Sequence, residues 1–503
     1  MAGADGYGGA DRSGLRDLNI VQTETVLLDP QASNSGSIFK PPVDYLSVVL
    51  DRSLSCYGGL WPKQRLALNL GLGGLGIFGL FVPAVLIVAA MALLWSVFAC
   101  LIIWRLVLIV LGAGLRLAFR GGRGNVLDLE KPVYSVLVPV YHETEMMTQL
   151  AGALSQIVWP RDRLDVQILF EADDVETLAA ADITRFPAGT RFTIVPAGGV
   201  RTKSNALNYG LTWALGDYVC IFDAEDRPHP GQLLEAYRAF RAGGGDLACV
   251  QAPLVADNGR EALLAAHWKL EYATQFGLLM PAMDILGLPI PIGGTSNHFR
   301  KPDLLMAGGW DAWNVTEDAD LGLRLARLGR RVGMLNLPTF EDAPTEFGVW
   351  AAQRSRWIKG FMQTWLVLMR QPRVLLKQLG VQRFVALQMT LGGAILAPLF
   401  HAPMLILIVA AGLFSQLSIG IFGAALLGLG LAVGFLSDVM APGRWSWSRV
   451  AAVLTRPLYW PLHSISAARA IWELVEAPHF WAKTPHTPHV WAKDRTCLNG
   501  SSA

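Results

Sequence analysis

Charged residues are scarce in this sequence. They make up 16% of its 503 residues, while 52% of the residues are hydrophobic, and soluble domains usually carry about 25% charged residues. The net charge is only +2, and no long run of Lys or Arg occurs. No nucleic-acid partner is therefore expected, because phosphate backbones are bound by concentrated positive charge. The shortage of charge instead indicates membrane spans.

Cysteine is also rare, and its spacing excludes the frameworks that cysteines usually build. The five cysteines include no C-x-x-C pair, which argues against a zinc site or a disulfide scaffold. Cys100, Cys220 and Cys249 lie within apolar runs, where a free thiol acts as a small hydrophobic side chain.

Residues 66–113 are almost wholly apolar. One span needs about 20 residues, so this run predicts two transmembrane helices joined by a tight turn near Pro83. We expect Arg105 near the end of the second helix, where its long side chain reaches the lipid headgroups. The letters of Gly71–Gly76 spell G-x-G-x-x-G, but no strand precedes them. Close helix packing through small residues accounts for them better than a dinucleotide site.

Hydrophobic runs return in the last third of the chain and define the predicted organisation. Basic residues follow the first hydrophobic region, so the positive-inside rule places the central region in the cytoplasm. The expected order is a largely disordered cytosolic tail (1–62), two transmembrane helices (63–115), a cytosolic domain (116–376), interfacial and transmembrane helices (377–475) and a C-terminal tail (476–503). Such a multi-pass chain is expected in the inner (plasma) membrane.

From Pro132 the sequence changes to short β-rich runs that alternate with amphipathic helices, the pattern of an α/β sheet. The expected strands are 135–139, 166–170, 192–195, 218–222 and 247–251. The expected helices are 145–156, 203–215, 231–241 and 261–276. Ligands of open α/β sheets bind beyond the carboxyl ends of the strands, so polar residues at those ends are the first candidates for a site.

An acidic cluster of Asp223, Glu225 and Asp226 directly follows the expected strand 218–222. A hard divalent cation such as Mg²⁺ or Mn²⁺ prefers carboxylate and diphosphate oxygens together, and these side chains can supply the protein's share of them. The alternative is a solvated acidic turn, which is common after strands.

Two further groups are suited to a nucleotide. Asp173 and Asp174 follow the strand 166–170, and a carboxylate there can accept hydrogen bonds from a base or a ribose. The alternative for this pair is a turn followed by a helix cap. Lys203 opens a predicted helix, where it is well placed for a phosphate, although an exposed helix start explains it equally well.

The stretch Asn314–Gly322 reads N-V-T-E-D-A-D-L-G and leads into a predicted helix. Asp318, with Glu317 beside it, is the candidate general base, because a hydroxyl that attacks an electrophilic carbon must lose its proton to a group within hydrogen-bond reach. The alternative is structural, since Thr316 is a natural N-cap and acids in a first turn favour the helix dipole.

Gln353, Arg356 and Trp357 belong to the stretch Q-R-S-R-W. Their spacing of i, i+3 and i+4 places them on one face of a helix. A guanidinium can bind a departing diphosphate, and an indole offers a flat face on which a sugar ring stacks. The alternative is an ordinary Trp/Arg pair at a membrane interface.

Five motifs follow one another between residues 133 and 370, namely V-P-V-Y, F-D-A-E-D, G-G-T-S-N, T-E-D-A-D-L-G and Q-R-S-R-W. In this order they make the chain resemble the membrane-embedded family 2 glycosyltransferases, which include the cellulose, hyaluronan and poly-N-acetylglucosamine synthases. The resemblance implies a GT-A fold: an α/β nucleotide-diphospho-sugar transferase domain inserted between N-terminal and C-terminal transmembrane helices. It also implies inversion at the anomeric carbon.

The resemblance implies roles for the candidate residues as well. Asp318 matches the catalytic base, and Asp173 and Asp174 match the uridine-binding acids. Gly294 and Thr295 stand where the family places a loop that lines the acceptor site. The residues that match Q-x-x-R-W, which contacts acceptor sugar and diphosphate, are Gln353, Arg356 and Trp357.

The metal motif departs from the family pattern. Asp223 matches the first residue of D-x-D, but the third position is Glu225, and Asp226 follows it. By the resemblance the cofactor is Mg²⁺ or Mn²⁺, and the departure leaves open which acid completes its shell.

The leading functional hypothesis is a hexosyltransferase that extends a β-linked polysaccharide and exports it. The expected donor is UDP-glucose, followed by UDP-N-acetylglucosamine and GDP-mannose, and the expected partners are this nucleotide sugar, a glycan or lipid acceptor, and membrane lipid. A first rival adds a single sugar to a lipid and shares every catalytic residue. A second rival is a non-catalytic receptor or transporter, but the predicted spans lack the acids of a coupled transporter.

Overall fold

The computed structural model describes residues 38–39, 50–118, 130–197, 200–413, 420–480 and 488. Some expectations fall on residues outside these ranges. They concern most of the N-terminal tail, the basic residues between 119 and 129, and most of the tail beyond residue 480.

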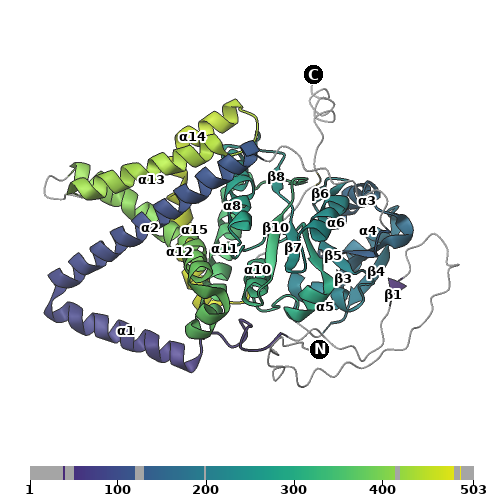
Figure 1. Cartoon of the computed structure of the whole chain (residues 1–503), viewed down its shortest axis with the longest axis horizontal. Helices are drawn as coiled ribbons and strands as arrows, with labels where there is room; N and C mark the ends of the chain where they lie inside the picture. Colours follow the sequence, from purple (N-terminus) through teal and green to yellow (C-terminus); the bar gives the residue numbers. More distant parts are fainter. Residues whose placement is uncertain are drawn as a thin grey trace, which may run out of the picture. The chain divides into compact units, whose positions relative to one another are not determined.

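An eight-stranded mixed sheet forms the centre of the domain (Figure 1). In spatial order its strands are β1 (Ile38–Phe39), β4 (Arg191–Val195), β3 (Leu164–Glu171), β2 (Tyr134–Val140), β5 (Tyr218–Ile221), β9 (Asn297–Arg300), β7 (Leu247–Gln251) and β10 (Arg331–Met334). The strands from β1 to β5 run parallel, whereas β9 is antiparallel to both of its neighbours. The carboxyl ends of the parallel strands therefore meet at one edge, the usual place for a ligand.

Helices cover both faces of this sheet, as its alternating side chains require. Val136 and Val138 of β2 belong to one buried cluster, and Leu137 between them belongs to another, because successive strand residues point to opposite faces. The helices of the domain are α3 (Met147–Ser155), α4 (Val175–Ile183), α5 (Lys203–Thr212), α6 (Gln232–Ala242), α7 (Leu263–Thr274), α8 (Met280–Ile285), α9 (Lys301–Met306) and α10 (Glu317–Arg327).

A second, three-stranded sheet lies next to the carboxyl edge of the first. Its order is β6 (Arg227–Pro228), β11 (Thr339–Glu341) and β8 (Leu254–Ala256). β6 follows the carboxyl end of β5, and β8 follows that of β7. The central strand β11 is thereby held beside the turns that carry the acidic clusters.

All the expected strands and helices of the domain are present, with ends shifted by no more than three residues. The antiparallel β9 was not predicted, because Asn297 and His298 interrupt the apolar pattern of a buried strand. Both side chains are buried, and the ring of His298 is hydrogen-bonded to Tyr134 and Gln232.

Among the described residues, three helices are long and apolar enough to cross a membrane. They are Pro83–Leu115 within α2 (Pro83–Ala118), Pro372–Ala410 within α12 (Pro372–Leu413), and α13 (Gly420–Met440). Helix α12 is kinked at Gly380, whose φ of 73° suits a residue without a Cβ.

Helix α1 (Pro62–Phe81) meets α2 at Val82, as the predicted turn requires. α1 is not one of the three candidate spans. A Cβ added at any of its glycines between Gly71 and Gly76 would meet no atom within 4 Å. The expected close packing through these glycines is therefore not found within the described chain.

Two findings bear on the hydrophobic segments. Arg105 donates to Ser437 Oγ of α13 at 3.4 Å and its side chain is exposed, so its contact with the lipid headgroups stays a prediction. The candidate span α13 includes an acid near its end, Asp438, which pairs with Arg456 at 2.6 Å. The expectation that the spans lack acids therefore does not hold at this position.

The predicted hydrophobic run 450–474 is broken into two helices, α14 (Trp447–Tyr459) and α15 (Leu462–Glu476). α14 packs on α7, and α15 packs on α12 and on α11 (Phe347–Leu368), the long helix that contains Q-R-S-R-W. Helix α11 also contacts α10, so it links the domain to the apolar helices (Figure 1).

Residues 50–61 do not behave as part of a disordered tail. Ser55 Oγ and the Cys56 backbone N–H both donate to the Asp311 carboxylate, at 2.7 and 2.6 Å. The Arg370 guanidinium donates to four backbone carbonyls of this segment. Polar groups of the domain therefore hold these residues in place, within the stretch 1–62 that was expected to be a largely disordered tail.

Candidate active site

One cavity of about 850 Å³ brings most of the predicted site residues together. This volume falls in the range of small-molecule sites. Ten of the thirteen residues line it, namely Lys203, Asp223, Glu225, Gly294, Thr295, Glu317, Asp318, Gln353, Arg356 and Trp357. The three that do not are Asp173, Asp174 and Asp226.

The acidic turn after β5 divides its carboxylates between the cavity and the protein interior. Asp223 and Glu225 line the cavity. Asp226 is 1% exposed, and its Oδ2 accepts hydrogen bonds from the Asp223 backbone N–H, at 2.7 Å, and from Thr295 Oγ1. Oδ2 of Asp226 thus holds Asp223 and the Thr295 loop in place, whereas its Oδ1 is buried without a hydrogen-bond partner. The role of Asp226 as a metal ligand stays a prediction.

Lys203 begins α5, where Thr202 provides the N-cap. Its Nζ pairs with Asp223 and donates to the Gly294 carbonyl at 2.7 Å. Burial alone lowers the pKa of Lys203, but Asp223 and Glu317 outweigh burial and raise it above the usual value. Lys203 is thus a fixed cation between the two acidic groups, the position that a diphosphate needs.

Gly294 lies against the candidate base. A Cβ built on it would stand 3.3 Å from Asp318 Oδ2, so a residue without a side chain keeps the space in front of the carboxylate open. The same loop contains Ser296, a residue other than glycine at φ 57°. Its Oγ donates to Thr339 Oγ1 of β11 at 2.6 Å, which helps to hold this uncommon backbone shape.

Asp318 and Glu317 occupy the first turn of α10. Thr316 stands at the N-cap, but its side chain makes no capping hydrogen bond. Burial raises the pKa of Asp318, against the opposing effects of the Ala319 N–H, Lys203 and Arg356. Burial and the neighbouring Asp318 together raise the pKa of Glu317 to about 7. A raised pKa makes a carboxylate a stronger base.

The start of α10 is held by close packing on α11. A Cβ at Gly360 would lie 2.3 Å from Thr316 Oγ1 and 2.5 Å from its Cγ2. Gly360→Ala is therefore expected to destabilise the protein by about 1–3 kcal/mol, because an inserted methyl group must push Thr316 aside. Thermal unfolding in detergent measures the loss. Gly348→Ala is the matched control, because Gly348 lies on the same helix and a Cβ there meets nothing within 4 Å. An equal loss of stability in both variants would contradict the packing account.

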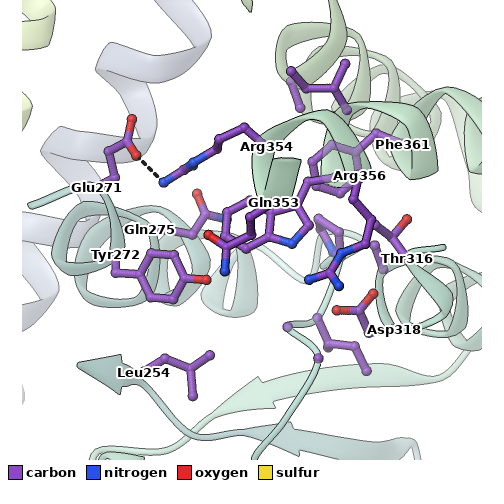
Figure 2. Close-up of a pocket in the computed structure, with 18 of the residues that line it drawn as sticks. Leu254, Glu271, Tyr272, Gln275, Thr316, Asp318, Gln353, Arg354, Arg356 and Phe361 are labelled. Carbon is purple, nitrogen blue, oxygen red and sulfur yellow. Dashed lines mark ion pairs between the residues drawn. The ribbon is translucent and has the colours of Figure 1, made fainter. Parts of the chain in front are cut away.

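The face of α11 that carries Gln353, Arg356 and Trp357 forms one wall of the cavity. Figure 2 shows the Arg356 guanidinium beside the Asp318 carboxylate. Gln353 Oε1 accepts a hydrogen bond from Trp268 Nε1 at 3.1 Å, which fixes the amide. The predicted helical spacing thus delivers an amide, a cation and an indole to the same space.

Asp174 makes the contacts of its structural alternative. It is 2% exposed, it caps α4 by accepting from the Thr177 N–H at 3.2 Å, and it accepts from the His142 N–H at 2.6 Å. It does not line the cavity, and its role toward a nucleotide stays a prediction. Asp173 pairs with Arg201 at 2.7 Å and stays partly exposed, so its role remains a prediction.

The sequence reasoning assigned no site role to several polar residues of the cavity wall. These are Glu171, Glu271, Tyr272, Glu341 and Arg354. Glu341 ends β11 and its Oε1 is buried without a hydrogen-bond partner. Burial, and then the nearby acidic turn, raise its pKa. A carboxylate at a strand end was the signal that identified Asp223, and the same signal was available for Glu341.

No group of three or more His, Cys, Asp or Glu side chains is arranged to hold a metal ion by itself in the described part of the chain. Asp223 and Glu225 nevertheless face the cavity, and Glu341 is close enough to them to raise its pKa. Mg²⁺ is usually bound by one or two carboxylates together with substrate phosphates and water, so this donor set fits a cation that arrives with a nucleotide.

Known proteins are similar to this chain over about half of its length. Residues 218–460 match the family model described as glycosyl transferase family group 2. Probable glucomannan 4-beta-mannosyltransferase 7 of Oryza sativa subsp. japonica is 27% identical over 249 residues, which cover 48% of this chain and 41% of the relative. A probable glycosyltransferase of Sulfolobus acidocaldarius is 27% identical over 233 residues, 46% of this chain and 50% of the relative. The chain spans about half the length of these relatives.

Solved structures with a similar chain trace were also found. The mannosyltransferase PcManGT from Pyrobaculum calidifontis, in complex with GDP-Man and Mn²⁺, is 19% identical with a TM-score of 0.47, over 76% of this chain and 99% of that chain. S. aureus TarS 1–349 is 13% identical with a TM-score of 0.35, over 70% of this chain and 93% of that chain.

Proposed function

We propose, from the premise that this chain belongs to glycosyl transferase family group 2, that it is a hexosyltransferase acting on a nucleotide sugar. The observation that carries the proposal is the convergence of Asp223, Lys203, Asp318 and Arg356 on one cavity. These side chains come from distant parts of the sequence, and together they supply the cation, anion and base that transfer from a sugar diphosphate needs.

In the proposed reaction an acceptor hydroxyl attacks the anomeric carbon of the donor, and the bond from that carbon to the diphosphate oxygen breaks. The hydroxyl proton passes to Asp318, and the nucleoside diphosphate leaves with the bonding electron pair. Attack from the face opposite the diphosphate inverts the anomeric carbon, so an α-linked donor yields a β-linked product. Lys203 and Arg356 neutralise the charge that develops on the leaving diphosphate.

Asp223 and Glu225 are the residues that would hold a Mg²⁺ or Mn²⁺ ion, with Glu341 nearby. When bound, such an ion neutralises the negative charge of the diphosphate. Asp226 contributes by fixing the Asp223 backbone, and Lys203 contributes by keeping the Asp223 carboxylate oriented toward the cavity.

The proposed product is a β-linked glycan, made by the cytosolic domain of a multi-pass protein of the inner membrane and exported past the apolar helices. Relatives named as probable glucomannan 4-beta-mannosyltransferases support a β-linked product. UDP-glucose remains the first donor to test, and these names raise GDP-mannose to second.

The direct test uses the purified full chain in nanodiscs with Mg²⁺ and a panel of radiolabelled sugar nucleotides. Labelled glycan of polymer length from one donor is the expected result. If no donor is consumed, the proposal is wrong.

A second candidate is transfer of one sugar to a lipid acceptor. It is favoured by the far end of the cavity, where apolar residues of the candidate spans form the wall, among them Leu101 and Leu108 of α2 and Ala397 of α12. The product of the same assay decides between the two, because a single-sugar lipid is extracted into organic solvent and does not lengthen with time.

Trp357→Ala is expected to reduce sugar transfer by about tenfold and to leave donor hydrolysis by water largely unchanged. The indole offers a stacking surface to an acceptor sugar, worth about 1 kcal/mol or more, and water needs no such surface. Both activities are followed in one assay, as label in product and label in free sugar. Trp445→Ala serves as the control, because Trp445 is an exposed tryptophan outside the cavity. Equal losses of transfer and hydrolysis in Trp357→Ala would contradict sugar stacking.

A further inference from the structure

Arg354, the second residue of Q-R-S-R-W, has no part in the proposed chemistry, and its side chain extends away from the catalytic acids. Figure 2 shows it directed toward Glu271 of α7, with 2.6 Å between Nη2 and Oε2. The guanidinium carbon also lies over the Trp357 ring, 4.6 Å from its centroid, and 5.8 Å from that of Trp350. Arg354 therefore covers one face of the indole to which the proposed function assigns the acceptor sugar.

Glu271 is the point at which four helices meet. In addition to its ion pair with Arg354 of α11, its carboxylate accepts a hydrogen bond from the Tyr459 hydroxyl of α14 at 3.0 Å and lies 3.4 Å from His463 Nε2 of α15. Arg456 Nη1 is 3.8 Å away. Glu271 itself belongs to α7, so the carboxylate is held from several directions and has little freedom to move.

The charge of Glu271 is also fixed. Burial by itself would raise its pKa, but Arg354, His463 and Arg456 outweigh burial and hold the pKa well below the usual value. Glu271 is consequently a carboxylate at neutral pH. Such a carboxylate gives the largely buried Arg354 a permanent partner, and removal of one member of a buried pair leaves an uncompensated charge.

We infer that Glu271 and Arg354 form a positioning pair for the acceptor: Glu271 holds the planar guanidinium against Trp357, so that the indole keeps one orientation in the cavity wall, where the acceptor sugar would bind. A guanidinium stacks on an indole where an ammonium cannot, because it is flat and weakly hydrated. The pair lies beside the acceptor end of the cavity, and the acids and Lys203 that face the donor keep their own partners. The inference rests on the proposed function, since it concerns the residue that binds the acceptor.

The test measures how donor is divided between transfer and hydrolysis. Full-length protein in nanodiscs is incubated with Mg²⁺ and radiolabelled UDP-glucose, and label in product is compared with label in free glucose. Glu271→Gln, which keeps the shape and removes the charge, is expected to lower the transfer-to-hydrolysis ratio by about tenfold, the effect of a lost cation–π contact in a desolvated site. UDP binding, measured by calorimetry, should change by less than about twofold, a difference that corresponds to about 0.4 kcal/mol.

A conservative variant and a double mutant distinguish a positioning role of the pair from a general effect on stability. Glu271→Asp should recover part of the ratio, because it restores the negative charge. Arg354→Gln should lower the ratio in the wild-type background but have little further effect in Trp357→Ala, because residues that act through one another are not additive. Additive losses would mean that Arg354 acts elsewhere and would overturn the inference.

Asp165→Asn is the matched structural control. Asp165 is buried and pairs with Arg191 Nε at 2.9 Å, and neither residue lines the cavity. Asp165→Asn should lower the midpoint of thermal unfolding and leave the transfer-to-hydrolysis ratio unchanged. An equal fall in the ratio for Asp165→Asn, or an unchanged ratio in Glu271→Gln with normal UDP binding, overturns the inference.

Two other outcomes are kept distinct. If Glu271→Gln does not fold, Arg354→Lys is measured in its place, because it keeps the positive charge and loses the planar group. A wild-type transfer-to-hydrolysis ratio in Arg354→Lys would contradict the inference. A wild-type protein that consumes no sugar nucleotide contradicts the proposed function itself and removes the premise.

Discussion

Asp318→Asn should reduce sugar transfer by about 10²–10⁴-fold, the usual contribution of a positioned general base. The substitution keeps the size of the side chain and its place on α10, and it removes only the ability to take a proton. Nucleotide binding should survive, because Lys203 and Arg356 remain in the cavity. Radiolabel incorporation measures transfer, and calorimetry with UDP measures binding.

Asp320→Asn, two residues further along α10, is the control for this experiment. Asp320 is buried and pairs with Arg324 at 2.7 Å within the same helix, so its loss should weaken the fold and spare the chemistry. Thermal unfolding and transfer rate together distinguish the two variants. Substantial turnover in Asp318→Asn would show that Asp318 is not the general base, even if every other residue of the cavity proved important.

Asp223→Asn should weaken UDP binding in the presence of Mg²⁺ or Mn²⁺ by at least about tenfold, because even partners outside the first coordination shell usually contribute 10–100-fold to metal affinity. Without divalent cation the wild-type protein and Asp223→Asn should bind UDP with more similar affinities. Titration of UDP with and without the metal measures both quantities, and an unchanged metal effect would exclude Asp223 as a ligand.

Asp226→Asn provides the contrast that tests whether Asp226 supports the turn or binds the metal. An asparagine oxygen can still accept from the Asp223 N–H and from Thr295, the two donors that Asp226 Oδ2 contacts. We therefore expect Asp226→Asn to retain much more of the metal effect than Asp223→Asn. If the two variants lose it equally, Asp226 belongs to the metal shell after all.

The sequence predicted the domain well where one local pattern dominates. Alternating and continuous apolar runs placed the strands from β2 to β5, and β7, to within a few residues. Helical spacing correctly put Gln353, Arg356 and Trp357 on one face of α11. These results depend on the period of the backbone, which a short stretch of sequence already contains.

The sequence could not decide which of several neighbouring acids faces a ligand. Asp173 and Asp174, or Asp223, Glu225 and Asp226, look alike as letters, yet Asp174 caps a helix and Asp226 supports a turn. A single residue's shift along a tight turn reverses the direction of its side chain. The direction is set by hydrogen-bond donors such as Thr295, which lies far away in the sequence.

By itself, then, the amino-acid order specified an α/β domain between apolar helices and the motifs that mark its chemistry, because these features are written in neighbouring residues. Only the folded chain decided that Glu271 meets Arg354, and that the Arg354 guanidinium lies over the indole of Trp357. Such contacts join helices separated by many residues, and their geometry depends on how whole elements pack, which no local pattern contains.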